Sequence, residues 1–280
     1  MYDRIEKTGS SQIQHGKYND RIYLMHYAAE DGPELLQRLD TLAEQESYSK
    51  IFAKVPGDTA ALFLQHGDRC EAEVPGFFRG RQAAAFMCKY FDQTRAVDEQ
   101  ADEIEANLAA ARKRAPATQV SAPQLPEGFS LRQAVTDDAK AISALYRQVF
   151  ETYPFPVHDP DYIRQTMESH VIYYCVHSQG ELAAVSSAEM AKEDAVVEMT
   201  DFATLPVCRG KGIARVLLAH MEARMPELGI KTAYTIARAM SMPMNAVFAA
   251  RGFVFGGTLI KNTQICGQLE SMNVWYRHLG

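Results

Sequence analysis

The chain lacks the features that mark membrane-anchored, exported and disulfide-rich proteins. Its 280 residues contain no run of about 18 apolar residues and no charged-then-apolar leader, so we expect neither a membrane span nor a signal peptide. The five cysteines are odd in number and lack C-x-x-C spacing, which argues against a disulfide framework and a zinc site. We therefore expect a cytoplasmic protein with free thiols and no metal.

Two common nucleotide-binding signatures are also missing. Neither a Walker-type G-x-x-x-x-G-K-[ST] loop nor a dinucleotide G-x-G-x-x-G motif occurs. A net charge of −6 argues against nonspecific nucleic-acid binding and is compatible with a cationic small substrate. With 47% apolar residues the chain can bury one large core or two moderate ones, and its length favours two domains.

The stretch 195–219 combines a strand, a glycine turn and a helix. Apolar residues dominate 196–202, as in a mostly buried strand, and they return at helical spacing after Gly212. The turn 209–214 places small residues where the helix begins, so several backbone N–H groups can converge on an anion. Its basic side chains add positive charge to the helix dipole, a combination that suits a pyrophosphate.

This turn, R-G-K-G-I-A after a strand ending in L-P, resembles the R/Q-x-x-G-x-G/A acyl-CoA signature of the GNAT superfamily of N-acyltransferases. Arg209, Gly212 and Ala214 occupy its defining positions. The alternative is a tight turn in an ordinary α/β protein, which the order of strand, turn and amphipathic helix disfavours. The resemblance implies acetyl-CoA as co-substrate, bound by Phe202, Ala203, Thr204, Arg209, Gly210, Lys211, Gly212, Ile213, Ala214, Ser241 and Asn245.

The last part of the chain, 129–280, predicts the whole GNAT fold, an α/β fold with a mixed sheet. The patterns give a strand, two helices, three antiparallel strands, a helix, a strand, a helix and two strands. Thr136 is expected to cap the first helix. Residues 98–128 predict a charged, exposed helix followed by a proline-containing linker, which is the expected domain boundary.

The first part, 1–97, resembles the second half of a GNAT fold. After a polar stretch that predicts a loose arm or short hairpin, strand and helix patterns follow in the same order as near the C-terminus. Among the residues that a shift of 185 aligns without a gap are four identical pairs of apolar or glycine residues along 51–87, although identities are few and chance is the alternative. The pairs are Ile51 with Ile236, Phe63 with Phe248, Gly67 with Gly252, and Met87 with Met272.

No counterpart of the turn 209–214 occurs in this first part. We therefore expect one CoA per chain. We expect the N-terminal domain to pack against the catalytic domain, to close the acceptor pocket or to form a homodimer.

Longer strings resemble the beta-lysine N-acetyltransferases. These are YSKIFAKVP at 48–56, EAEVPGFFRG at 71–80, FMCKYF at 86–91, YPFPVHDPDYI at 153–163 and ESMNVWYRHL at 270–279. The resemblance implies acetyl transfer to the side-chain amine of beta-lysine, giving the compatible solute N-epsilon-acetyl-beta-lysine. The alternatives are acetylation of a polyamine or protein lysine, and a silent acyl-CoA-binding sensor.

An alkyl ammonium ion with a pKa of about 10.4 must lose a proton before it attacks a thioester. Glu198 occupies a strand position where similar family members carry a glutamate used as base, and Asp201 is the second choice. Either can instead be an ordinary strand carboxylate. Phe248 stands where the family often has a tyrosine acid, so the acid is open between Tyr234, Tyr276 and water.

A cationic amino acid needs carboxylates for its amines and a donor for its carboxylate. The loop from Tyr153 to Asp159, including Phe155, falls where GNAT enzymes commonly cover the acceptor, and Arg238 is the candidate for the acceptor's carboxylate. The alternative for the loop is a stiff connector. Further acidic candidates, by residue type alone, are Glu71, Glu73, Glu151, Glu189 and Glu270.

Overall fold

The computed structural model describes residues 2–116 and 122–279, so part of the expected proline linker lies outside the described residues. The first half of the chain forms six strands and three helices. They are β1 (Arg4–Thr8), β2 (Ser11–Gly16), β3 (Arg21–His26), α1 (Gly32–Gln45), β4 (Lys50–Pro56), α2 (Ala60–Gln65), β5 (Arg69–Phe78), β6 (Gln82–Tyr90) and α3 (Ala101–Arg112).

The second half follows the order expected of a GNAT fold. Its elements are β7 (Phe129–Gln133), α4 (Ala139–Val149), α5 (Pro160–Ser169), β8 (Val171–Ser178), β9 (Glu181–Ala191), β10 (Val196–Thr204), α6 (Ile213–Arg224), β11 (Thr232–Arg238), α7 (Met242–Ala250), β12 (Val254–Ile265) and β13 (Gln268–His278). In the described part of the chain, no helix combines the length and the apolar character needed to span a bilayer.

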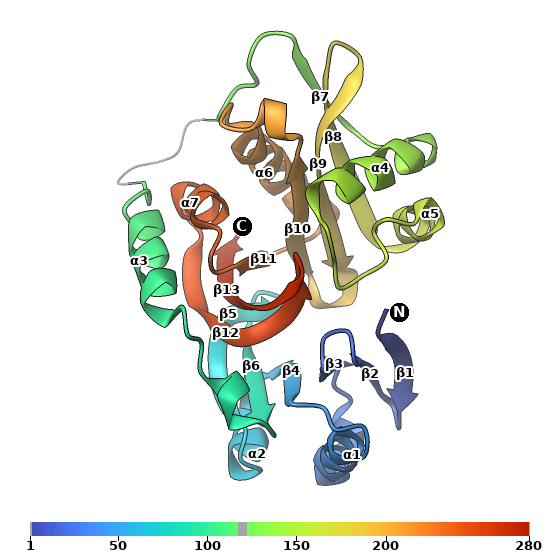
Figure 1. Ribbon diagram of the computed structural model, residues 1–280, viewed down its shortest axis with the longest axis vertical. Coiled ribbons are helices and arrows are strands. Elements are labelled where there is room, and N and C mark those ends of the chain that lie inside the picture. The colour runs from blue at the N-terminus through green and yellow to red at the C-terminus, as the bar shows by residue number, and fades with distance from the viewer. Residues whose placement is uncertain (1, 117–121, 280) are drawn as a thin grey trace.

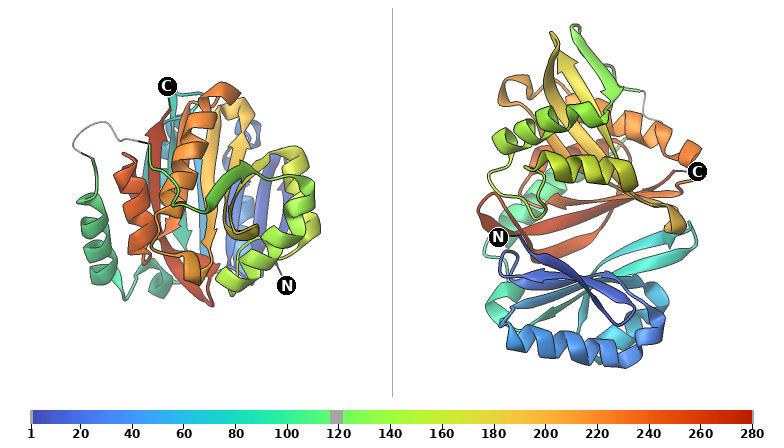
Figure 2. Two further views of the ribbon diagram at one scale, coloured as in Figure 1. Left: turned by 90° about the horizontal axis from the view of Figure 1, so that it is seen from above. Right: turned by 90° about the vertical axis from the view of Figure 1, so that its right-hand side faces the viewer.

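One mixed sheet runs through both halves, in the order β1-β2-β3-β4-β6-β5-β12-β13-β11-β10-β9-β8-β7 (Figure 1). The halves join where β5 and β12 pair antiparallel, with Ala72 opposite Gly257. The apolar cluster beneath this junction draws on both halves, with Val74 and Phe86 packed among Leu259 and Val274. The two halves therefore share a core as well as a sheet, and the right view in Figure 2 shows them stacked along the long axis.

The strand order on the two sides of this junction is the same. β3-β4-β6-β5 on one side corresponds to β10-β11-β13-β12 on the other, with the first two strands parallel and the others antiparallel. Ala72 lies 185 positions before its partner Gly257, the same spacing as the sequence shift. The division into domains at residues 97 and 129 stays a prediction, because the sheet is continuous across it.

Helices cover both faces of the second half. α4 and α5 pack on one face, whereas α6 and α7 pack on the other (Figures 1 and 2). The expectation that 98–114 forms an exposed helix is wrong for one side of α3. Ile104, Leu108 and Ala111 are buried, and Leu108 joins the core cluster that contains Phe248.

The structure decides two local expectations, one about the first residues of the chain and one about the start of α4. The first residues form the hairpin β1–β2, and its inner strand is buried, with Ile13 fully inside. The expected cap at Thr136 is wrong. A short 3-10 turn precedes α4, and the Asp138 carboxylate accepts the N–H of Val135 at 2.8 Å, so Asp138 satisfies the free backbone donor there.

Candidate active site

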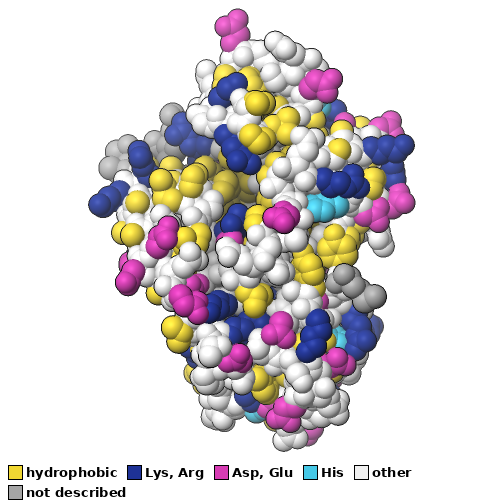
Figure 3. Space-filling model, in the orientation of Figure 1, with side chains coloured by type: hydrophobic (Ala, Val, Ile, Leu, Met, Phe, Trp, Pro, Cys, Tyr) yellow, Lys and Arg dark blue, Asp and Glu magenta, His cyan; other side chains and the backbone are white. Residues whose placement is uncertain are grey.

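The glycine turn after β10 opens onto a groove of about 620 Å³ formed by β10, β11, α6 and α7. Gly212 precedes α6 with φ +76°, a left-handed conformation that favours glycine, and a Cβ on it would meet no atom within 4 Å. Figure 3 shows hydrophobic side chains gathered on this face between α7 and α4, with Lys and Arg side chains beside them. Eight predicted CoA residues line the groove: Phe202, Thr204, Arg209, Gly210, Gly212, Ile213, Ala214 and Ser241.

Three predicted CoA residues do not line it. Ala203 is buried in the cluster under α4 and α5, and the Lys211 ammonium lies 5.2 Å from the ring centre of Phe129. Asn245 is fully buried, and both ends of its amide are engaged. Its nitrogen donates to two backbone carbonyls, and its oxygen accepts from Trp275 at 2.8 Å and from Asn273 at 2.9 Å. The assignment of Asn245 to CoA is therefore wrong, because it has no free group for a ligand.

β10 and β11 separate beside this groove. Their pairing ends at Glu198 opposite Tyr234, and β10 then carries a bulge in which Asp201 adopts φ +53°. A cavity of about 120 Å³ lies at the point of separation and includes Glu198, Thr200 and Asp201 in its lining. Thr200 and Asp201 line both the cavity and the groove, so the two spaces meet at the bulge.

The Glu198 carboxylate accepts a hydrogen bond from the Tyr234 hydroxyl at 2.8 Å. That hydroxyl in turn accepts a hydrogen bond from the Lys54 ammonium at 3.0 Å, so a residue of the first half reaches the predicted base through one side chain. Burial, reinforced by the nearby Glu189 charge, raises the pKa of Glu198 to about 7. A carboxylate with this pKa can accept a proton near neutral pH.

Asp201 is held by other groups. Its carboxylate accepts hydrogen bonds from the Tyr153 hydroxyl and from the Ser187 hydroxyl, the latter at 2.5 Å. Burial raises the pKa of Asp201 above its usual range and raises the pKa of the Tyr153 phenol well above its usual range. Tyr153 lines both the cavity and the groove, and no other tyrosine of the described residues does so.

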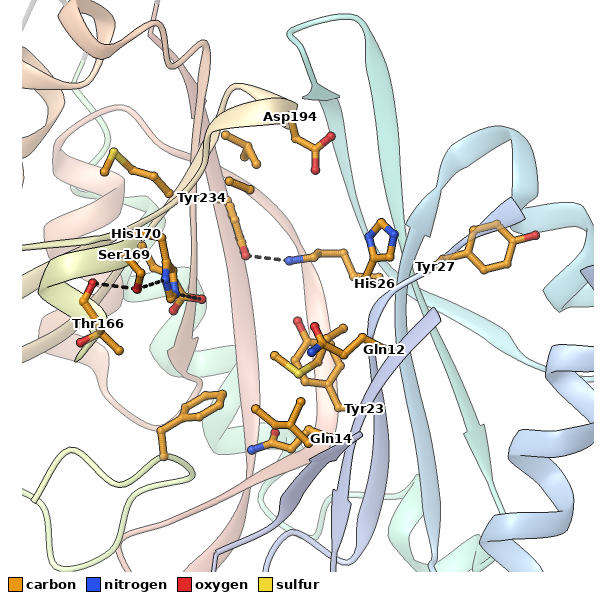
Figure 4. A pocket seen from close by; sticks show the side chains of 18 of the residues that line it. Gln12, Gln14, Tyr23, His26, Tyr27, Thr166, Ser169, His170, Asp194 and Tyr234 are labelled. Carbon is orange, nitrogen blue, oxygen red and sulfur yellow. Dashed lines mark hydrogen bonds and ion pairs between the residues drawn. The ribbon is translucent and has the colours of Figure 1, made fainter. Parts of the chain in front are cut away.

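A cleft of about 1140 Å³ lies on the other side of the cavity, between the two halves of the chain. Figure 4 shows Gln14 and Tyr23 on one wall and Tyr234 and His170 on the other. The cleft and the cavity share several lining residues, namely Tyr23, Met25, Lys54, Pro154, Phe155, Tyr162, Thr166, Glu189 and Tyr234. The bulge is therefore open to the groove on one side and, through the cavity, to the cleft on the other.

Of the predicted acceptor residues, Tyr153 and Phe155 line the cavity, but two others do not. Asp159 is exposed, and it accepts the N–H of Asp161 at 2.9 Å as the cap of α5, so its carboxylate serves the helix. Arg238 lines the groove, where its Nε donates to Glu270 at 2.6 Å. The structure gives no support to the expectation that Arg238 receives the acceptor's carboxylate, because this residue does not line the cavity and its guanidinium is paired with Glu270.

Sequence reasoning allowed for the first half closing the acceptor pocket but missed the residues with which this half lines the cavity. Arg21 and Tyr23 from β3 and Lys54 from β4 all line it. One sequence signal for this contribution was present in KIFAKVP at 50–56. There Lys54 interrupts an apolar strand whose other residues are mostly buried. Glu189 was named by residue type alone, and the structure brings it to the cavity.

The chain is similar to known acetyltransferases. Residues 140–253 match the acetyltransferase (GNAT) family. The beta-lysine N(6)-acetyltransferase of Methanococcus maripaludis is 37% identical over 277 residues, covering 98% of each chain. N-acetyltransferase YodP of Bacillus subtilis is 31% identical over the whole of both chains. The beta-lysine N(6)-acetyltransferase of Methanosarcina mazei is 41% identical over 56% of this chain and 58% of its own.

The first two matches run through both halves of the chain, including the strands that carry Arg21 and Lys54. The family match spans the glycine turn and the β10 bulge, where the groove and the cavity meet. The protein is a member of the GNAT acetyltransferase family, whose enzymes transfer an acyl group from acyl-CoA to an amine.

Proposed function

We propose that the protein transfers acetyl from acetyl-CoA to the side-chain amine of beta-lysine and so makes N-epsilon-acetyl-beta-lysine, a cytoplasmic compatible solute. Two relatives named for this activity support the choice of acceptor. The observation that carries the proposal is Glu198, a carboxylate with a pKa raised to about 7 that lines the cavity on the strand whose bulge joins the cavity to the groove.

The groove fits acetyl-CoA by its shape and its chemistry. The exposed Arg209 and the backbone of the turn up to Gly212 would hold the pyrophosphate at the start of α6, where backbone N–H groups lack helical partners. The apolar lining beyond, with Met244 and Val247 of α7, suits the pantetheine arm. Acetyl-CoA supplies the activated acetyl group when it is bound.

Glu198 accepts a proton from the acceptor ammonium, which frees the nitrogen lone pair for attack. Tyr234 holds the carboxylate in place through its 2.8 Å hydrogen bond. Asp201 and Phe202 lie outside the pairing of β10 with β9, so the backbone of the bulge would donate to the thioester oxygen as negative charge develops there.

Tyr153 is the proposed acid. Its raised pKa keeps the phenol protonated, and its side chain lines the space on both sides of the bulge. The ammonium ion gives up two protons in all. Glu198 takes the first and passes it to solvent. Tyr153 gives its proton to the departing sulfur, and the second nitrogen proton, lost as the amide forms, restores the Tyr153 phenol through solvent.

The test is the release of CoA with purified protein and a panel of amines: beta-lysine, lysine, ornithine and spermidine. We expect the highest kcat/KM with beta-lysine and, by mass spectrometry of the product, one acetyl group on N6. Higher kcat/KM with spermidine would contradict the proposed acceptor. Binding of acetyl-CoA without turnover of any amine would instead indicate an acyl-CoA-binding sensor.

A further inference from the structure

Arg21 is a buried cation that has no anionic partner within the described parts of the chain, 2–116 and 122–279. Arg21 is the first residue of β3, and it is 4% exposed. One guanidinium nitrogen donates to the carbonyl of Asn262 and, at 3.3 Å, to the hydroxyl of Thr263, whereas Nε has no partner. Burial lowers the pKa of Arg21 to about 10, so the group stays charged at neutral pH. A buried charge is costly unless an opposite charge lies beside it.

Two neighbouring buried cations differ from Arg21 in this respect. Lys50, Arg95 and Arg21 each donate to a backbone carbonyl of β12, at three successive residues, 260 to 262. Lys50 also pairs with Glu71 at 3.4 Å, and Arg95 pairs with Asp20 at 3.6 Å. Among the residues that the structure describes, Arg21 forms no ion pair. Arg21 also lines the cavity beside Glu198, whereas Lys50 and Arg95 do not.

The cavity carries opposite charges on its two walls. Glu189 and Glu198 come from β9 and β10 of the second half, and Arg21 and Lys54 come from β3 and β4 of the first. Asn262 also lines the cavity, is 1% exposed, and has an amide oxygen without a partner. Arg21 and Asn262 both line this cavity, and each carries a buried polar atom that no described residue satisfies, which indicates a ligand at this site.

These contacts define the chemistry of the missing ligand group. A guanidinium with a free donor suits a carboxylate, and the carboxylates on the opposite wall suit ammonium groups. A diamino acid carries both. A diamine or polyamine carries ammonium groups but no carboxylate, so it would leave the Arg21 charge uncompensated.

We propose that Arg21 binds the carboxylate of the acceptor, with Lys54 adding positive charge beside it, so that the first half of the chain supplies the carboxylate subsite. The inference rests on the proposed function, and it makes Arg21 a specificity-determining residue. This role gives a function to the first half, which has no counterpart of the turn 209–214. The first half holds the acceptor against the second half.

The test compares beta-lysine with beta-lysinamide, in which the carboxylate is replaced by a neutral amide of similar size. We expect wild-type protein to prefer the acid by about 10²-fold in kcat/KM, because hydrogen bonds between charged groups in a buried site are worth this much. Arg21→Gln should reduce the preference to a few-fold, mainly through KM for the acid. Arg21→Lys, which keeps the charge but loses the fork, should retain about tenfold. Both acceptors are measured on one enzyme preparation, so a loss of folded protein cancels in the ratio.

Arg95→Gln is the matched control. Arg95 is equally buried and donates to the carbonyl of Lys261, next to that of Asn262, but it does not line the cavity. It should keep the full preference for the acid. A wild-type ratio near one would overturn the inference without any variant, and so would an unchanged ratio in Arg21→Gln. If spermidine were the preferred acceptor, the proposed function would fail as well. If beta-lysine were acetylated with the ratio unchanged by Arg21→Gln, only the inference would fail.

Discussion

Glu198 and Tyr234 are the last residues to pair across the parallel strands β10 and β11, and the Tyr234 hydroxyl donates a 2.8 Å hydrogen bond to the Glu198 carboxylate. Beyond this pair the strands separate, and the cavity and the groove proposed for acetyl-CoA fill the gap. The proposed base therefore lies at the apex of the opening. Lys54, from the other half of the chain, completes the arrangement by donating to Tyr234.

Glu198→Gln should lower turnover by about 10²-fold while nearly keeping acetyl-CoA affinity, because positioned proton transfer contributes on that scale. The loss should shrink as pH rises, since more acceptor is already deprotonated. In the wild type, kcat/KM should fall as pH decreases through about 7, where the Glu198 carboxyl becomes protonated and can no longer accept a proton. Glu193→Gln, an exposed residue in the turn before β10, is the control. Wild-type turnover by Glu198→Gln at neutral pH would point to Asp201 or water as the base.

Gly212→Asp should abolish acetyl-CoA binding without unfolding the protein. The new side chain would enter open space in the groove and place a negative charge where the pyrophosphate is expected. Gly229→Asp is a matched control, because Gly229 also has a left-handed backbone and open space but lies outside the groove. Calorimetric titration of both variants, with circular dichroism to check folding, decides the matter. Unchanged CoA affinity in folded Gly212→Asp would refute the assignment of the turn.

Tyr153→Phe should lower kcat by about tenfold to 10²-fold, because it removes the proposed proton donor to sulfur and keeps the ring. The KM values for both substrates should change little. Tyr146→Phe is the control, since Tyr146 is a buried tyrosine that lines neither the cavity nor the groove. Steady-state kinetics with full activity in Tyr153→Phe would remove this residue from the mechanism and leave water as the acid.

One acetyl-CoA should bind per chain. The first half lacks a turn like 209–214 at the start of a helix, so it offers no comparable pyrophosphate site. Isothermal titration of the full-length protein should give a stoichiometry near one. Two equivalent sites per chain would contradict this view of the first half.

Arg95→Gln should destabilise the folded protein by about 2–4 kcal/mol, because breaking a buried charged network leaves several groups unsatisfied. Arg95 donates to the carbonyls of Asn19, Asp20 and Lys261 and so ties β12 to the first half. The exposed Arg114→Gln should change the free energy of unfolding by no more than about 0.5 kcal/mol. Urea unfolding of both variants measures the difference. Equal midpoints and slopes would show that this network contributes nothing to stability.

The sequence by itself determined the features that depend on neighbouring residues. The turn 209–214 predicted its own helix start and the groove beside it, because a glycine with positive φ and the small residues around it act locally. Element order in 129–280 followed from local hydrophobic periodicity. Glu198 was predicted as the base because it occupies a strand position where similar family members carry a glutamate.

Only the tertiary structure decided what each polar side chain faces. Asn245 and Arg238 looked available in sequence, yet one is closed off in the core and the other is paired with Glu270. Arg21 gave no local signal, and its contact with Asn262 spans 241 residues. Such a contact depends on strand pairing between the two halves. β3 can lie opposite β10 only because β5 pairs with β12 and joins the two halves. Local patterns carry no record of that pairing, so the acceptor cavity could not be assembled from the sequence.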